Sequence, residues 1–310
     1  MATIRALALV LVWSSGFIGA ELGARAAPPT TLLAWRFLVI AVVLLPWLPR
    51  AADRREWMRQ AVLAVLCQCL YLVGVYWAAA AGVPAGTSAL IASLQPALVL
   101  AAAALLGSRR FRFAHACGLT LGSAGVALTA AGDLSAGVSI TALVLPLLAM
   151  LSLAAGTLLQ QRWTTTPRTS TPLMQSLATQ AVISAGLITA YTAVVGDLTP
   201  PATTAFWTAT AWAALAGIGS YGLYYLVTTR DGAERASTLL YLTPAATALW
   251  ATAMFSEPLR RTAVIGLLVS AVAVAVLNTA SKGPVKRRGE PGPDPLPPGR
   301  SVGPATACGR

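Results

Sequence analysis

Aromatic and amide side chains interrupt a sequence that is otherwise strongly apolar. Tyr221, Tyr224 and Tyr225 follow the spacing of one helix face. A Tyr or Trp ring offers apolar area together with one hydrogen-bonding group, which suits the lining of a cavity inside a helical bundle. The alternative is a belt at the lipid interface, which fits Trp77 and Trp207 well. We expect a substrate-binding surface formed by Trp13, Tyr71, Gln95, Tyr224 and Tyr241.

Two prolines occupy corresponding places in two apolar segments. Pro96 and Pro244 each lie in mid-segment and follow polar residues. Proline removes one backbone hydrogen bond of a helix and bends it. In lipid the freed carbonyl needs a partner, so such bends usually face protein or a water-filled cavity. We expect two kinked helices that line a central cavity and act in gating. The alternative is that the membrane helices merely tolerate the prolines.

Charged side chains within the apolar segments are few. Arg36 lies well inside its segment, where an Arg costs on the order of 2.5–3.5 kcal/mol on insertion scales. Glu21 lies at a similar depth on the preceding segment, so we expect a structural Glu21–Arg36 ion pair. The alternative is that Arg36 meets an anionic group of a substrate. Glu257 is a further candidate for gating or for coupling to an ion.

The sequence lacks the groups that catalysis or metal binding would need. All ten Asp and Glu residues fall at segment ends, in loops or in the C-terminal tail. The single His and the four Cys residues cannot form a zinc set. Neither an HExxH motif nor a GxSxG motif with usable partners occurs. We therefore expect neither an enzyme nor a cofactor.

Ten apolar segments must position these residues. The chain is 56% hydrophobic and 10% charged, with a mean hydropathy of +0.70, whereas soluble domains are nearer a quarter charged. A helix needs roughly 20 apolar residues to cross a bilayer. We predict an all-α, polytopic membrane protein with ten transmembrane helices, near residues 4–22, 31–49, 60–81, 84–107, 112–132, 138–161, 172–195, 204–228, 233–256 and 261–279.

The basic residues orient this arrangement. Most of the 22 Lys and Arg residues fall on the side that holds both termini. Because basic residues favour the cytoplasm, we predict an inner-membrane protein with both termini cytoplasmic. The excess positive charge of +12 is thus explained by basic residues gathered on the cytoplasmic side. We therefore expect the lipid bilayer, and not nucleic acid, as a partner.

The two halves of the chain resemble each other. Residues 71–128 align with residues 219–276 at a constant offset of 148, and the alignment pairs Gly74 with Gly222 and Pro96 with Pro244. Because each half has five segments, a shared fold would place the second half upside down relative to the first. We predict two five-helix inverted repeats, residues 1–135 and 136–280, and a disordered basic tail, residues 281–310.

Small residues recur four apart in the last segment of each half. Gly118 and Gly122 correspond to Gly266 and Ser270. This spacing permits close helix packing. We expect these segments to pack within the molecule, and the alternative is a homodimer face.

Several stretches resemble the EamA family of the drug/metabolite transporter superfamily. They are VWSSGFIGAEL at residues 12–22, WRF at 35–37, VPAGTSALIASLQPALVLAAAALLG at 83–107 and GAERASTLLYLTPAATALWATAMFSEPLRRTAVIGLLVSAVAVAVL at 232–277. The resemblance covers about residues 4–279 and implies a ten-helix carrier of two inverted repeats. Such proteins commonly carry Gly-Glu after the fourth and ninth helices. Here the first copy reads Gly107-Ser108-Arg109, which leaves Glu257 without a counterpart.

The sequence predicts a secondary transporter that works by alternating access. The expected cavity is walled by the first, third, fourth, sixth, eighth and ninth segments. The resemblance adds that the substrates are small metabolites, namely amino acids or related amphipathic compounds, and that they are exported. The alternative is a non-transporting membrane protein, such as a lipid-handling or structural factor, in which Gln95, Tyr224 and Tyr241 would face lipid.

Overall fold

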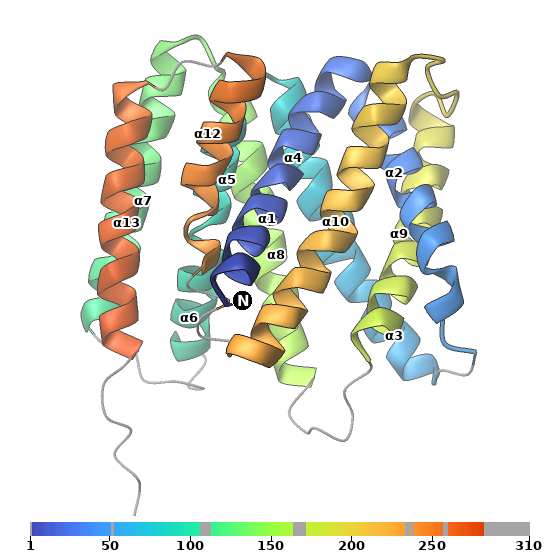
Figure 1. Ribbon diagram of the computed structural model, residues 1–310, viewed down its shortest axis with the longest axis horizontal. Coiled ribbons are helices and arrows are strands. Elements are labelled where there is room, and N and C mark those ends of the chain that lie inside the picture. The colour runs from blue at the N-terminus through green and yellow to red at the C-terminus, as the bar shows by residue number, and fades with distance from the viewer. Residues whose placement is uncertain are drawn as a thin grey trace, which may run out of the picture.

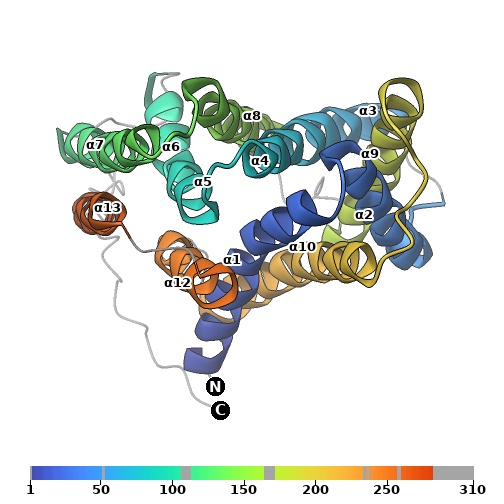
Figure 2. The same ribbon diagram turned by 90° about the horizontal axis from the view of Figure 1, so that it is seen from above.

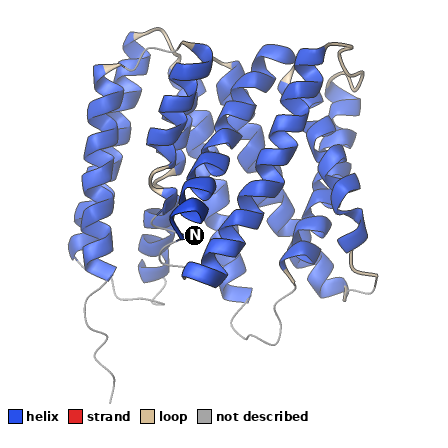
Figure 3. Cartoon of the chain, in the orientation of Figure 1, coloured by secondary structure: helices blue, strands red, loops and turns tan. Residues whose placement is uncertain are grey.

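The computed structural model describes residues 2–50, 53–105, 113–163, 172–232, 236, 239–256 and 260–281. Every regular element in these ranges is helical, and the helices run side by side (Figures 1 and 3). The first half contains α1 (Ala2–Ala26), α2 (Pro29–Leu44), a short 3-10 helix (Leu45–Trp47), α3 (Arg54–Leu63), the π-helical η2 (Ala64–Leu70), α4 (Tyr71–Ala80), α5 (Ala85–Ala92), α6 (Gln95–Leu105) and α7 (Phe113–Ser135). The second half contains α8 (Ile140–Trp163), α9 (Leu173–Val195), α10 (Thr204–Asp231), α12 (Thr243–Phe255) and α13 (Arg261–Ser281).

Six helical stretches are long and apolar enough to cross a membrane. They are Ala2–Ala26, Pro29–Trp47, Arg54–Ala80, Ala116–Ser135, Ile140–Trp163 and Leu173–Val195. The prediction of an all-helical fold with several apolar helices is thereby confirmed for the described residues. The count of ten spans and the inversion of the second half stay predictions, because the other described helices do not meet the same length and hydropathy.

The segments that contain Pro96 and Pro244 are broken helices, which corrects the expectation of a kink within a continuous helix. The turns at residues 93–94 and 241–242 end one helical stretch, and α6 and α12 begin directly after them. Pro96 and Pro244 therefore lie in the first turn of a new helix, where an N–H is not needed and the fixed φ of proline is favourable.

The backbone hydrogen bonds at the two breaks correspond at the same offset of 148 residues. The amide of Leu94 donates to the carbonyl of Ile91, and the amide of Leu242 donates to that of Leu239, at 3.1 and 3.0 Å. Each is a three-residue bond of the 3-10 type, which tightens the last turn of a helix. The likeness of the halves thus extends from sequence to local backbone geometry.

Helix α1 is the central helix of the bundle. It packs against α10, α12, α4 and α5, while α7 and α13 lie at one edge and α2 and α9 at the other (Figure 2). Side chains of α10 bond to its backbone: the indole Nε1 of Trp212 donates to the carbonyl of Ser15 at 2.9 Å, and Ser220 Oγ donates to that of Val12 at 3.3 Å.

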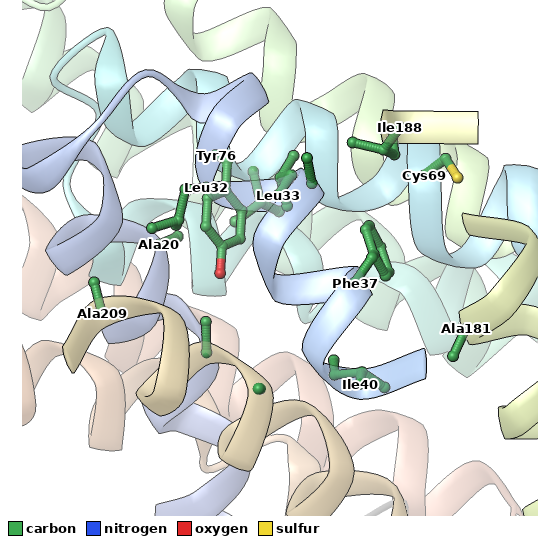
Figure 4. Packing of buried hydrophobic residues seen from close by; sticks show 14 of the residues in the cluster. Ala20, Leu32, Leu33, Phe37, Ile40, Cys69, Tyr76, Ala181, Ile188 and Ala209 are labelled. Atoms are coloured by element: carbon green, nitrogen blue, oxygen red, sulfur yellow. The ribbon is translucent and has the colours of Figure 1, made fainter. Parts of the chain in front are cut away.

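The largest buried cluster joins α1 and α2 to α4, α9 and α10. Leu32, Leu33 and Phe37 of α2 are almost fully buried, next to Tyr76 of α4 and Ile188 of α9 (Figure 4). Alanine and other small residues supply much of the rest, so neighbouring helices approach closely.

Glycines set the contact between α7 and α13. A Cβ on Gly125 would lie 2.6 Å from the carbonyl oxygen of Gly266, and it would also meet Ser270. A Cβ on Gly132 would overlap Thr262. The small residues of the last segments therefore pack within the molecule, as expected, and the homodimer alternative stays untested.

The glycine contact predicts a stability difference between two identical substitutions. Gly125→Leu should lower the thermal midpoint of the purified protein, because overpacking typically costs about 1–3 kcal/mol. Gly186→Leu on α9 is the matched control, since a Cβ there meets nothing within 4 Å. It should leave the midpoint unchanged or slightly higher, because Leu has the better helix propensity. Equal midpoints for the two variants would contradict the close α7–α13 packing.

Candidate functional site

Aromatic side chains of α1 and α10 meet near the middle of α1. The Trp13 ring lies edge-on to that of Tyr221, with 6.0 Å between centroids, and 5.8 Å from that of Tyr224. The amide Nε2 of Gln68 donates to the hydroxyl of Tyr221 at 3.2 Å. Tyr71, the first residue of α4, packs together with Tyr221 against the largest buried cluster. We call Trp13, Gln68, Tyr71, Tyr221 and Tyr224 the central aromatic cluster.

Local helix geometry explains this convergence. Tyr221 and Tyr224 are three residues apart, so they share one face of α10. Gln68 belongs to the π-helical η2, and π-helical turns often occur at functional sites. A neighbouring helix supports η2, because Ser152 of α8 donates its hydroxyl to the carbonyl of Leu66 at 2.8 Å. Hydropathy carries no signal for such a turn, so the sequence offers Gln68 beside Tyr71 but does not predict its contact with Tyr221.

Arg36 lies beside the cluster as a buried cation with no counter-ion in the described parts of the chain. It is only 7% exposed. Its Nε donates to the carbonyl of Ala213 at 3.2 Å, but its Nη1 has no hydrogen-bond partner among the residues that the structure describes. The guanidinium carbon is 5.9 Å from the ring centroid of Tyr76 and within electrostatic range of Tyr71. Gly217 of α10 makes room for it, since a Cβ there would lie 2.9 Å from Nη2.

The expected Glu21–Arg36 ion pair is wrong. Glu21 instead pairs with Arg25, whose Nε and Nη2 both lie 2.9 Å from Glu21 Oε1. These two residues are one turn apart on α1, so their pairing needs no second helix. The guanidinium of Arg36 turns toward the backbone of α10 instead. The free-energy cost of burying Arg36 is therefore not offset by Glu21.

Three of the five expected substrate residues converge, and two do not. Trp13, Tyr71 and Tyr224 belong to the central aromatic cluster. Gln95 instead donates to Thr157 Oγ1 of α8 at 3.0 Å. Tyr241 is half-buried at the turn before α12. No described hydrogen bond or ring contact joins Gln95 or Tyr241 to the cluster, and Glu257 lies outside the described residues.

A polar face of α12 was missed by the sequence analysis. Thr243, Thr247 and Trp250 are spaced i, i+4 and i+7, so they share one face of the helix. Each buries a side-chain polar atom that has no hydrogen-bond partner within the described residues. The ring of Trp250 lies edge-on to that of Trp212, with 6.0 Å between centroids. The helical spacing of the three residues is the signal that could have revealed this face.

A cavity of about 260 Å³ lies at the end of the bundle where α1 and α7 end, and we call it the end cavity. Its walls come from α1, the α4–α5 loop, α5, α7, α12 and α13. Asp133 is 3% exposed and accepts a 2.6 Å hydrogen bond from Thr87 Oγ1. Sequence reasoning set Asp133 aside as a segment-end residue, because hydropathy does not reveal which neighbours cover such a position.

The gathered groups are suited to holding a small molecule. The central aromatic cluster combines apolar rings with hydroxyl and amide groups, as ligand pockets commonly do. Within the described residues no group of three His, Cys, Asp or Glu side chains could hold a metal ion.

The chain is similar to known proteins in fold and in family. A solved structure described as "Crystal structure of protein" aligns with 90% of this chain and 96% of its own, at a TM-score of 0.63 and 17% sequence identity. At that identity the match shows a shared fold alone. No curated protein matches the sequence. The model of the EamA-like transporter family matches residues 1–131 and again residues 140–279. Because these matches cover almost the whole chain, the protein belongs to the EamA-like transporter family.

Proposed function

We propose that this membrane transporter is a secondary carrier that exports small amphipathic metabolites, such as amino acids, by alternating access. The observation that carries the proposal is the central aromatic cluster, which gathers rings, an amide and hydroxyls inside an apolar helical bundle. Buried polar groups in a membrane protein are costly and usually mark a pathway. The direction of transport rests on the family resemblance.

The chemistry of the cluster favours a substrate with an apolar part and a carboxylate. The rings of Trp13, Tyr221 and Tyr224 offer apolar area and hydrogen-bonding tips. Arg36 adds a buried guanidinium whose Nη1 is unused. Guanidinium groups bind carboxylates by charge-assisted hydrogen bonds. A carboxylate would therefore offset the burial of Arg36.

The paired helix breaks support alternating access. Carriers of inverted-repeat architecture commonly place discontinuous helices beside the substrate site, and one half then moves against the other. Here α6 and α12 both begin just after a break, at positions related by the offset of 148 residues. The division into repeats at residues 1–135 and 136–280 and the count of ten spans belong to this proposal. So do the cytoplasmic termini and the location in the inner membrane.

The alternative function, a non-transporting lipid-handling or structural factor, predicts polar side chains that face lipid. Gln95 instead bonds to Thr157 of a neighbouring helix, and Tyr224 packs on Trp13. These contacts favour the carrier.

Removal of a cluster ring should reduce transport without unfolding the protein. In proteoliposomes, Trp13→Ala should lower the flux of the best substrate from a metabolite panel by about tenfold, because ring contacts are worth about 0.5–1.5 kcal/mol each beyond burial. Trp207→Ala is the matched control, since Trp207 is 43% exposed and packs on Trp35 away from the cluster. It should keep near-normal flux. If both variants transport equally well, the cluster is not the substrate site.

A second pair of variants separates a binding role of Arg36 from a structural one. Arg36→Met should leave the thermal midpoint equal or higher, because a buried, unpaired charge is removed. It should nevertheless reduce the transport of carboxylates by about tenfold or more. Arg5→Met is the control, since Arg5 makes a two-pronged ion pair with Asp231 at 2.7 and 2.9 Å, and its loss should lower the midpoint. A large loss of stability in Arg36→Met would instead assign Arg36 a structural role.

A further inference from the structure

The end cavity brings opposite charges to an otherwise apolar space. Leu90, Ala251 and Leu267 supply apolar lining, while Asp133 and Arg260 supply a carboxylate and a guanidinium. A cavity near 260 Å³ is smaller than the roughly 300–1,000 Å³ of sites for drug-sized ligands. The space therefore suits a compound of about amino-acid size.

Asp133 is the unusual group in this cavity. Its side chain is almost fully buried, yet its one described partner is the neutral hydroxyl of Thr87. A buried carboxylate normally needs an ion pair as well as hydrogen bonds. The other acid, Glu21, already has a cation in Arg25. Asp133 is thus the carboxylate in the cavity that is left to receive a cation.

Arg260 lies close enough to influence Asp133 but does not pair with it. The two groups interact electrostatically, and no ion-pair contact joins them among the described residues. Arg260 is exposed at the rim, whereas Asp133 is buried in the wall. A ligand with both an ammonium and a carboxylate group could therefore bridge the two side chains.

We propose that the end cavity is a second, zwitterion-binding site, in which Asp133 binds the ammonium group of an α-amino acid and Arg260 binds its carboxylate. The apolar lining receives the side chain of the ligand. The inference deepens the proposed transport function, because the cavity lies at the end of the bundle predicted to face outward, where an exported substrate would pause before release. It is distinct from the central aromatic cluster in residues and in place.

The competing explanation is structural. The Thr87–Asp133 hydrogen bond ties α5 to α7, and Asp133 would then matter only for packing. Asp133→Asn separates the two explanations, because an Asn oxygen still accepts the bond from Thr87 but carries no charge. Thr87→Val measures the structural contribution by itself, since it removes the hydrogen bond between α5 and α7 and keeps the Asp133 side chain.

The test uses the full chain in lipid nanodiscs and a readout confined to the cavity. Thr252 lines the end cavity, so alkylation of a Thr252→Cys variant whose four native cysteines are replaced by Ser reports occupancy there and not at the central cluster. The twenty common L-amino acids are screened for protection of this cysteine. The best one is then compared with its decarboxylated amine and its deaminated acid.

The expected pattern is charge-specific. Asp133→Asn should weaken protection by the amino acid and by the amine by about tenfold or more and leave the acid unchanged. Arg260→Gln should weaken protection by the amino acid and the acid and leave the amine unchanged. Thr87→Val should not reproduce this charge-specific pattern, because any loss of packing affects the amine and the acid alike. Protection by no amino acid, or an equal loss for amine and acid in Asp133→Asn, would overturn the proposal.

A separate flux measurement distinguishes this failure from failure of the carrier proposal. Normal transport of amino acids by Asp133→Asn proteoliposomes, together with no protection of the cysteine, would reject the second site and leave the carrier standing. An absence of flux for every compound in wild-type proteoliposomes would reject the carrier itself.

Discussion

Backbone amides and carbonyls in a bilayer have no water to bind, so each must find a partner inside the protein. This constraint governs where the chain can depart from a regular helix. The two helix breaks meet it with matching three-residue bonds, from Leu94 to Ile91 and from Leu242 to Leu239. The π-helical η2 meets it with a hydroxyl from a neighbouring helix. At both breaks and at the π-helix, the irregular backbone therefore keeps hydrogen-bond partners within the protein.

The position of α1 turns these local departures into a site. Helix α1 packs against α10, α12, α4 and α5, and its residue Trp13 meets the tyrosine face of α10. Two side chains of α10 bond to the backbone of α1 and fix how the tyrosine face of α10 meets it. Arg36 approaches from α2 past Gly217. The result is a buried polar surface in an apolar bundle. The side chains of Trp212 and Ser220 hold α10 against α1 by hydrogen bonds to backbone carbonyls.

Much of the fold could be predicted from hydropathy, because long apolar helices are specified by composition alone. The offset of 148 residues also located both breaks, although it could not show that the prolines begin new helices instead of bending old ones. The Glu21–Arg36 pair failed because depth in a segment does not give the direction of a side chain. The partner of Gln68 could not be predicted, because a π-helical turn changes the direction in which the side chain points. Asp133 was missed because burial at a segment end depends on tertiary neighbours.

The carrier function is tested most directly by counterflow in proteoliposomes loaded with unlabelled substrate. The site of an alternating-access carrier can return across the membrane with substrate bound, so the carrier exchanges labelled for unlabelled molecules. We predict that unlabelled amino acid inside the vesicles drives a transient accumulation of labelled amino acid above its equilibrium level. Unrelated compounds inside the vesicles should not do so. A flux that rises linearly with concentration and is indifferent to internal substrate would contradict a carrier.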